Sequence, residues 1–185
     1  MIHFPDFPQL AGRYTKTSEE DASYNCIAWA AGRNNEYWWP DANGVWPITE
    51  KKETIECFVN AFLSLGYSEL PGDNERLEAG VEKVAIFAIG TEPTHAARQM
   101  PNGRWTSKMG VYQEDIEHEW GAVDGPAYGT VARILRRGTS QDKLPDSPTG
   151  WRYISRLPST CIRAIVRRWR SVISRLFQRN ENSSQ

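Results

Sequence analysis

The sequence predicts an α+β fold in which a short N-terminal helix bearing a cysteine packs on an antiparallel β-meander. Three observations indicate this class. Cys26 stands where the helical stretch YNCIAWAAG begins, a continuous apolar run follows at residues 84–89, and residues 94–109 have the pattern of a β-hairpin. A basic amphipathic helix near the C-terminus completes the predicted architecture.

The first helix is predicted to begin at Cys26, because Asn25 is a good N-cap and Gly32 is a natural stop. At a helix start the unpaired backbone N–H groups and the positive end of the helix dipole favour a thiolate over a thiol. Cys26 is therefore a candidate nucleophile, and Asn25 or the Cys26 amide is a candidate oxyanion donor. The alternative is a cysteine that simply packs in an apolar helix, since cysteine is commonly buried.

A loop after Gly32 holds three of the eight tryptophans, Trp38, Trp39 and Trp46, between prolines that exclude regular structure. Aromatic side chains close to a nucleophile can wall a substrate cleft, because they offer a large and rigid contact area. The alternative is that these rings fold back as a lid over the core.

Apolar residues at spacings of three and four predict a second helix from Thr49 to Leu65. Cys57 lies off the centre of its apolar face and has no base among its sequence neighbours, so we interpret it as structural. The continuous apolar run of residues 84–89 predicts a central strand that is buried on both faces.

The hairpin turn is predicted at Pro101-Asn102-Gly103, between strands at residues 94–100 and 104–109. This order of residues suits a type I turn closed by a left-handed glycine, so Met100 should face Arg104. One face of the hairpin then carries His95, Ala97, Trp105 and Ser107. A two-residue Asn-Gly turn would slip the register and place Lys108 there instead.

His95 is the candidate general base. In a Cys-His hydrolase the imidazole takes the thiol proton and later protonates the leaving group, while a third group orients the ring. The predicted register places Ser107 beside His95, where its hydroxyl can fix the tautomer. The other candidates for the third group are Lys108, Asp115, Glu117 and His118. The structural alternative is a single strand-borne histidine that serves packing alone.

The remaining elements are predicted from shorter patterns. Residues 114–118 are expected to form a short helix, and residues 128–135 an edge strand. The predicted organisation is then one domain over residues 1–137, a linker over 138–159, an amphipathic helix over 160–179 and a disordered tail over 180–185.

Cysteine usage and hydropathy bear on where the protein resides. Three cysteines, Cys26, Cys57 and Cys161, make an odd count without paired spacing, so we expect a reduced, cytoplasmic protein. Residues 1–10 lack the basic start and the apolar run of a signal peptide, and no segment of about 20 apolar residues predicts a membrane span.

Charge is unevenly distributed along the chain. Residues 160–185 carry six arginines and one acid, a net charge of +5, which leaves −6 on residues 1–159. An acidic body argues against nucleic-acid binding by the domain. The helix over residues 160–179 has arginines opposite an apolar face, which suits an anionic membrane surface, a protein partner or docking on its own domain.

Metal and cofactor motifs are not evident. Cys26, His95 and His118 are potential zinc ligands, but the sequence contains no Cys-x-x-Cys or His-x-x-x-His spacing. Its glycines are scattered, and none lies in the strand-to-helix loop that cradles phosphates. We therefore expect neither a metal nor a cofactor.

Taken together, these motifs resemble the papain-like superfamily in its compact bacterial forms, the NlpC-type and CHAP-type amidases and peptidases. The chain is more closely similar to an uncharacterised bacterial family of small papain-like proteins. The segments that carry this similarity are YNCIAWAAG, the WWP and VWP pairs, GVEKVAIFA, THAARQMPNGRWTSKMG and DIEH, from about Tyr24 to Arg137. The resemblance implies an α+β fold with Cys26 as nucleophile and His95 as base, and it implies no known substrate.

Two registers of this resemblance are open. NlpC-type enzymes place the base before the strand that is similar to residues 84–89, where this chain has Lys83, and a site of that kind would have lost its base. Papain-type enzymes place the base at a strand head and a polar orienting group one hairpin later, which His95 and Ser107 match. We favour the papain register.

The sequence thus favours a thiol-dependent hydrolase that acts on an amide or peptide bond of a peptide or protein substrate. Deamidase and transglutaminase chemistry use the same Cys-His pair, and a toxin or effector role is compatible with it. The alternative is a non-catalytic recognition module whose tryptophans wall a groove.

Overall fold

The structure, a computed structural model, describes residues 2, 4–42, 44–69, 72, 74–110 and 113–139. These residues belong to one compact unit, Met1–Asp142. The predicted amphipathic helix and tail, and nearly all of the predicted linker, lie outside the described residues. Within the described ranges, no helix is long and apolar enough to cross a membrane.

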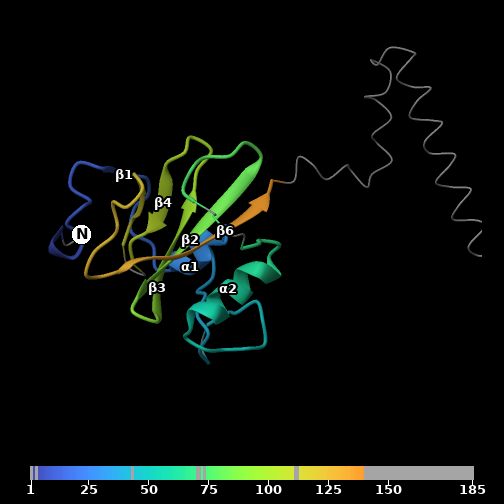
Figure 1. Ribbon diagram of the computed structural model, residues 1–185. Helices are drawn as coiled ribbons and strands as arrows, with labels where there is room; N and C mark the ends of the chain where they lie inside the picture. Colours follow the sequence, from blue (N-terminus) through green and yellow to red (C-terminus); the bar gives the residue numbers. More distant parts are fainter. Residues whose placement is uncertain are drawn as a thin grey trace, which may run out of the picture. The chain divides into compact units, whose positions relative to one another are not determined.

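A six-stranded antiparallel sheet forms the centre of the described part of the chain (Figure 1). The strands are β1 (Tyr14–Lys16), β2 (Val81–Ile89), β3 (Glu92–Gln99), β4 (Trp105–Lys108), β5 (Asp115–His118) and β6 (Thr130–Gly138). Their order is β1-β5-β4-β3-β2-β6, so β2 to β5 form a meander and β6 is an edge strand. The predicted α+β class is confirmed.

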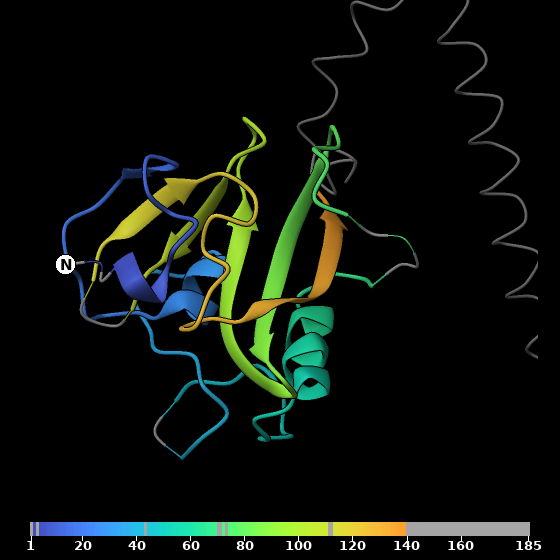
Figure 2. The same cartoon turned by 60° about the vertical axis from the view of Figure 1, so that its left-hand side comes forward.

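Two α-helices cover one face of the sheet. The helix α1 (Cys26–Ala30) packs on β3 and β4, and α2 (Ile55–Ser64) packs on β2 and β6 (Figure 2). Apolar side chains of both helices meet the same face in one cluster, which includes Ile27, Ala28, Phe58, Phe62, Val84, Ile86, Ala96 and Leu135. Cys57 is buried and its sulfur contacts the Glu50 carbonyl at 3.4 Å, in agreement with a structural role.

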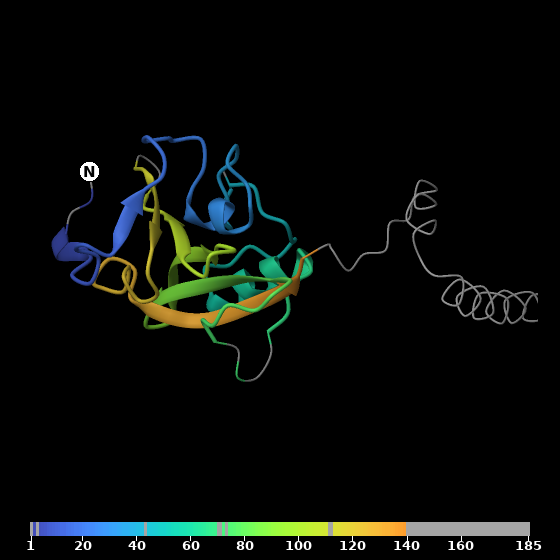
Figure 3. The same ribbon diagram turned by 90° about the horizontal axis from the view of Figure 1, so that it is seen from above.

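The opposite face is covered by chain without α-helix. The N-terminal segment, with a short 3₁₀-helix at Phe4–Asp6, lies beside the connection that precedes β6 (Figure 3). The cluster on this face includes Phe7, Leu10, Ala85, Phe87, Ala97, Trp105, Ile116 and Val123. Because side chains alternate along a strand, Ala96 belongs to the helix-covered face and Ala97 to the other.

The predicted hairpin register is confirmed. Met100 N–H donates to the Arg104 carbonyl at 2.7 Å, and Gly103 N–H donates to the Met100 carbonyl at 2.9 Å. Gly103 has a φ of 85°, the left-handed conformation that the turn requires. Arg98 pairs with Thr106 and Gln99 with Trp105, so the turn has three residues and not two.

Two predicted elements are corrected. The second helix begins at Ile55 rather than Thr49, because Thr54 is its N-cap and accepts the Cys57 N–H at 3.3 Å. Residues 115–118 form the strand β5 rather than a helix, since both neighbours pair with it: Glu117 lies opposite Thr106 on one side and Thr15 on the other.

The three loop tryptophans pack on the core. Trp38 is 3% exposed and meets Trp46 edge to face. Trp39 and Trp46 each contact the Phe58 ring, with centroids 5.3 and 5.0 Å away. These contacts fit the alternative in which the rings cover the core, while Trp39 and Trp46 keep partial exposure and the substrate cleft at these residues stays a prediction.

Asn25 joins this loop to α1. Its Oδ1 accepts the Ala28 N–H at 3.1 Å and the Trp38 N–H at 3.2 Å, while its Nδ2 donates to the Trp38 carbonyl at 2.7 Å. The side chain is 4% exposed, so all three bonds are shielded from water. One amide thus caps the helix and holds the loop.

We predict that Asn25→Ala lowers the free energy of unfolding by about 3 kcal/mol, because it removes an N-cap and leaves the buried Trp38 backbone groups unpaired. Urea denaturation measures this change. Asn34→Ala, at an exposed position, is the control and should change stability little. A loss no larger than that of the control would contradict the clamp.

Candidate active site

Cys26 is the first residue of α1 and is partly exposed. The helix lies against β3 and β4, so the thiol is near the middle of the sheet. The backbone N–H groups of Ala96, Ile27 and Cys26 itself act on the sulfur and favour its thiolate. Ala96 immediately follows His95 on β3, so the sulfur lies close to the backbone that carries the predicted base.

Although the residue keeps partial exposure, the protein packed around the sulfur disfavours the thiolate, raises the pKa of the Cys26 thiol to about 11 and outweighs those N–H groups. The sequence led us to expect that the helix start would stabilise a thiolate, and the structure corrects this expectation. The resting group at pH 7 is a thiol. The helix has only five residues, and so few aligned peptide units give a weak dipole.

Asn25 is engaged in structural hydrogen bonds, and its predicted oxyanion role stays a prediction that depends on the second N–H of Nδ2. Both atoms of its side-chain amide are already bonded, Oδ1 to Ala28 and Trp38 and Nδ2 to Trp38. The backbone amide of Cys26, the other predicted donor, is directed at the sulfur and stays a candidate.

His95 and Ser107 come together as the predicted register requires. His95 is fully buried, and its Nε2 lies 2.9 Å from Ser107 Oγ. The imidazole stacks on the Tyr128 ring, with centroids 3.9 Å apart and planes 4° from parallel. Within the described ranges, His95 Nδ1 has no hydrogen-bond partner.

Ser107 is also hydrogen-bonded to a second histidine, His118. Its Oγ lies 2.9 Å from His118 Nε2, and His118 Nδ1 lies 2.8 Å from the Glu119 carbonyl oxygen. Burial lowers the pKa of His118 to about 4. Burial, together with the charge of a protonated His118, lowers the pKa of His95 well below 6.5. Both rings are therefore neutral at pH 7.

These contacts fix the proton positions. A carbonyl oxygen only accepts, so His118 must donate from Nδ1, and its Nε2 is then an acceptor. Ser107 donates its hydroxyl proton to that Nε2 and accepts at Oγ from His95. His95 is therefore protonated at Nε2, and its Nδ1 carries a free lone pair. We call His95, Ser107 and His118 the buried relay.

The structure places Cys26 and His95 on either side of β3. Ala96 packs with the cluster beneath α1, whereas the His95 ring contacts Phe87 and Tyr128, which belong with the other cluster. No hydrogen bond joins the two side chains in the part of the chain that is described. The predicted hydrogen-bonded dyad is thus not formed in this conformation, although the predicted pairing of His95 with Ser107 is.

Tyr128 was not identified from the sequence. Its hydroxyl donates to the Met109 carbonyl, and its own carbonyl accepts from Thr94 Oγ1 at 2.6 Å. Those bonds hold the ring flat against the His95 imidazole and shield it from water. No sequence signal identifies Tyr128, because the reason for glycine at position 129, where a Cβ would lie 1.9 Å from the Ala88 carbonyl oxygen, is visible only in the folded chain.

The other candidates for the third group lie elsewhere. Lys108 and Asp115 are buried beside Tyr24, whose hydroxyl donates to Asp115 Oδ2 at 2.6 Å. Glu117 pairs with Arg104 at 2.8 Å. Only Ser107 and His118, of the five residues considered, connect to His95.

Lys83 has a structural role. It is fully buried, and its Nζ donates to the Asn74 and Arg76 carbonyls at 2.8 Å and pairs with Glu78 at 2.5 Å. These three contacts fasten residues 74–80 to β2. Lys83, which the NlpC-type register would align with a base, is therefore already engaged in these contacts.

No group of three metal-ligating side chains is found within the described ranges. Comparison with known proteins identifies one family, described as a domain of unknown function (DUF7689), over residues 15–136. The chain belongs to this family. Neither a curated protein nor a solved structure matches the chain. The matched residues include α1 and β2 to β5, and so contain Cys26 and the buried relay.

We predict that the protein is less stable at pH 5 than at pH 7. The pKa of His118 is about 4 in the folded chain against 6.5 as its ordinary value, so the unfolded chain binds more protons between these limits. Stability is full above pH 6.5 and falls as the pH approaches 4, by about 3 kcal/mol from His118. His95 shifts in the same direction.

Urea denaturation at several pH values measures this dependence. His118→Asn keeps a donor for the Glu119 carbonyl and removes the titrating ring, so its stability should depend less on pH. His3→Asn removes a histidine outside the relay and serves as the control. An unchanged pH slope in His118→Asn would show that His118 is not buried in its neutral form.

Proposed function

We propose that this protein is a thiol-dependent acyl-transfer enzyme, most simply a hydrolase of amide or peptide bonds, with Cys26 as nucleophile and His95 as base. The observation that supports this most is the free Nδ1 of His95. The buried relay fixes the ring as the Nε2–H tautomer, which leaves at Nδ1 the lone pair that a general base needs.

The proposed reaction has two halves. Cys26 Sγ attacks the carbonyl carbon as His95 Nδ1 takes the thiol proton, and the carbonyl oxygen becomes an oxyanion near the Cys26 amide. The tetrahedral intermediate collapses, the C–N bond breaks, and His95 returns its proton to the departing amine. Water then attacks the thioester, with His95 again taking a proton, and the acid and free Cys26 are released.

Both reacting groups start neutral. The raised pKa of Cys26 and the lowered pKa of His95 disfavour a resting ion pair of thiolate and imidazolium. The proposed proton transfer therefore accompanies attack and does not precede it. It also requires β3 to rearrange when substrate binds so that Cys26 and His95 meet, because the two side chains lie on opposite sides of that strand at rest.

Within this proposal, Ser107 and His118 are positioning residues. They hold the imidazole in one tautomer, as the third group does in Cys-His hydrolases. Ser107 lies one hairpin after His95, as in the papain-type arrangement that the sequence resembles. Tyr128 shields the face of the ring.

A recognition module is the second candidate. The separation of Cys26 and His95 by the backbone of β3 favours it, since a binding protein needs no base beside the thiol. On this alternative, the relay serves only to satisfy buried polar groups. The two candidates differ in whether His95 affects the chemistry of Cys26.

We predict that p-nitrophenyl esters of N-acyl amino acids acylate Cys26 and that His95→Gln slows this step by about 100-fold or more, the usual contribution of a general base. Release of p-nitrophenolate gives the rate, and peptide mapping by mass spectrometry locates the thioester. Ser107→Ala should also slow the step, because the imidazole can then adopt the wrong tautomer.

Cys57→Ala is the matched control, since it removes a buried thiol that lies outside the site. It should leave the rate unchanged, whereas Cys26→Ala should abolish the thioester. If Cys26 is acylated no faster than Cys57, or if His95→Gln has no effect in a folded protein, catalysis is excluded and the recognition module is supported.

A further inference from the structure

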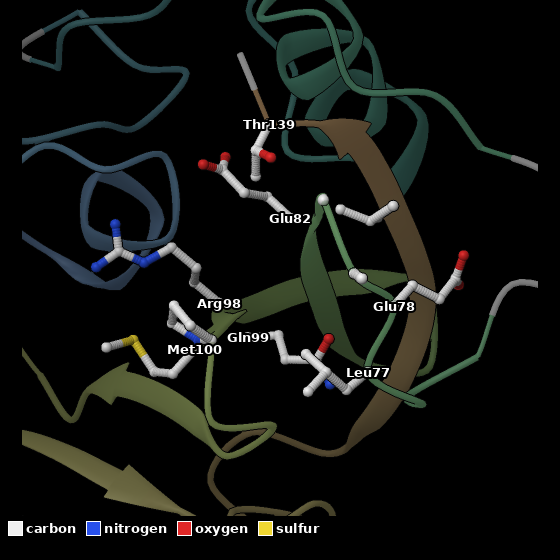
Figure 4. Close-up of a pocket in the computed structure, with 11 residues that line it drawn as sticks. Leu77, Glu78, Glu82, Arg98, Gln99, Met100 and Thr139 are labelled. Carbon is white, nitrogen blue, oxygen red and sulfur yellow. The ribbon is translucent and has the colours of Figure 1, made fainter. Parts of the chain in front are cut away.

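A cleft of about 720 Å³ opens at the end of the sheet where β2 begins and β3 ends (Figure 4). Its volume lies in the range of small-molecule sites. It is lined by residues 77–82, by Arg98, Gln99, Met100 and Pro101, and by Thr139. Neither Cys26 nor a member of the buried relay belongs to this lining.

The lining is divided between the two faces of the sheet. Val84 and Arg98 are cross-strand partners, and Val84 packs in the cluster beneath the helices, so Arg98 lies on the helix-covered face. Glu82 lies two residues before Val84 on β2 and therefore shares that face. Figure 4 shows the side chains of Glu82, Arg98 and Met100 extending toward the same side of the strands. Gln99, the residue after Arg98, lies on the opposite face.

Arg98 has an unused guanidinium group. It lies over the Trp29 ring, 4.8 Å from the centroid, and the side chain is partly exposed. Among the residues that the structure describes, it has no carboxylate within ion-pair distance and its side chain makes no hydrogen bond. The contact with Trp29 limits where the guanidinium can move, so its N–H donors are held in place for a ligand.

Glu82 is fixed by the neighbouring strand. Arg137 is its cross-strand partner on β6, and Arg137 Nε donates to Glu82 Oε2 at 2.7 Å. The Arg137 guanidinium in turn lies over the Tyr67 ring, 4.4 Å from the centroid, and donates from Nη1 to the Leu65 carbonyl at 3.2 Å. The Glu82 side chain is 37% exposed, and within the described part of the chain its Oε1 forms no ion pair. One carboxylate oxygen is therefore bound, and the other is available to a ligand.

Glu82 and Arg98 do not pair with each other, although their charges are opposite. Arg98 is opposite Val84, so Glu82 is its diagonal neighbour, and diagonal neighbours lie about 7 Å apart, within reach of long side chains. Each is held by its own partner instead, Glu82 by Arg137 on the adjacent strand. Arg98 is held by Trp29 on α1. Two fixed, opposite charges thus line one side of the cleft without neutralising each other.

We propose that this cleft binds a zwitterionic α-amino acid with an apolar side chain, whose carboxylate is held by Arg98 and whose ammonium is held by Glu82. The guanidinium offers the planar pair of donors that fits a carboxylate in a bidentate manner. The available oxygen of Glu82 accepts an N–H of the ammonium. Met100 contacts the apolar side chain of the ligand, because it lies beside Arg98 on the same side of the cleft and its flexible thioether adapts to different shapes. This binding is independent of acyl transfer at Cys26.

A zwitterion fits this pair of charges better than an ion of either sign. A simple anion is attracted by Arg98 but repelled by Glu82, and by Glu78 elsewhere in the lining. A simple cation meets the reverse arrangement. An α-amino acid carries both charges next to one carbon atom, so it can neutralise both side chains at once. A peptide matches the pair less well, since its two end charges are further apart.

The test uses the full chain and three probes: L-leucine, leucinamide, which lacks the carboxylate, and N-acetyl-leucine, which lacks the ammonium. Titration followed by backbone amide shifts gives the affinities, and shifts at Gly80, Arg98 and Met100 locate the site. We expect L-leucine to bind at least about tenfold more tightly than either analogue, because each analogue lacks one charge-assisted hydrogen-bonding group.

Two variants separate the two charges. Arg98→Gln should remove the preference for leucine over leucinamide and keep the preference over N-acetyl-leucine, whereas Glu82→Gln should do the reverse. Urea denaturation shows whether each variant is folded. Arg33→Gln is the matched control, since Arg33 is exposed near the end of α1 and lies outside the cleft. It should bind leucine as the native protein does.

Measurements on the native protein alone can overturn the proposal. Equal binding of leucine and both analogues does so, as does the absence of shifts at the three amides with leucine in large excess. If N-acetyl-leucine binds as tightly as leucine, the cleft is an anion site and the zwitterion is wrong. If leucinamide binds as tightly, the cleft is a cation site and the zwitterion is wrong again.

Discussion

A carbonyl oxygen can only accept a hydrogen bond, and this constraint at Glu119 orders the protons of the buried relay. His118 must donate to it, Ser107 must donate to His118, and His95 must donate to Ser107. The order holds because both rings are buried and neutral. A single backbone acceptor thereby leaves one lone pair free, at Nδ1 of the fully buried His95 ring.

The sheet register is what brings these three groups together. Ser107 and Ile116 are cross-strand partners, and Trp105 faces His118, so the two side chains of the relay on β4 and β5 are diagonal neighbours. A slip of one residue would turn Ser107 to the helix side and bring Lys108 to the relay. Gly103, in its left-handed conformation, sets the length of the turn and thereby the register that places Ser107 in the relay, although Gly103 does not contact the relay.

The hairpin and the first helix were predictable because their signals are local. Gly103 and Asn25 act within three or four residues of their own positions, through turn and cap chemistry. The strand β5 was mistaken for a helix because its short sequence is decided by pairing with β1 and β4, far away in the chain. Tyr128 was missed for a similar reason: it was placed in the predicted edge strand 128–135, whereas β6 begins at Thr130, and the contact of Tyr128 with His95 is made far away in the chain.

At Cys26, the N–H groups of the helix start lower the pKa of the thiol and burial raises it, and the larger of these two effects decides the protonation state. The sequence identifies the N–H groups at the start of α1, and they do act on the sulfur. It does not show how much protein surrounds Cys26, and the cost of burying the thiolate is the larger effect. Whether the thiol is buried depends on how α1 lies on β3 and β4, which is a property of the assembled sheet.

The strand β3 also relates the thiol to Arg98. On its helix side, Ala96 lies at the Cys26 end of α1, and Arg98 lies at the Trp29 end. Residues two apart on a strand are separated by about 7 Å, so the sulfur contact at Ala96 and the Arg98 side chain are neighbours on one face of the sheet. Trp29 is fixed there by its bond to Thr106 at 3.1 Å and by its contacts with Tyr24 and Arg98. The position of Arg98 therefore depends on the same short helix that positions Cys26, while the two groups take part in different contacts and either can be removed without the other.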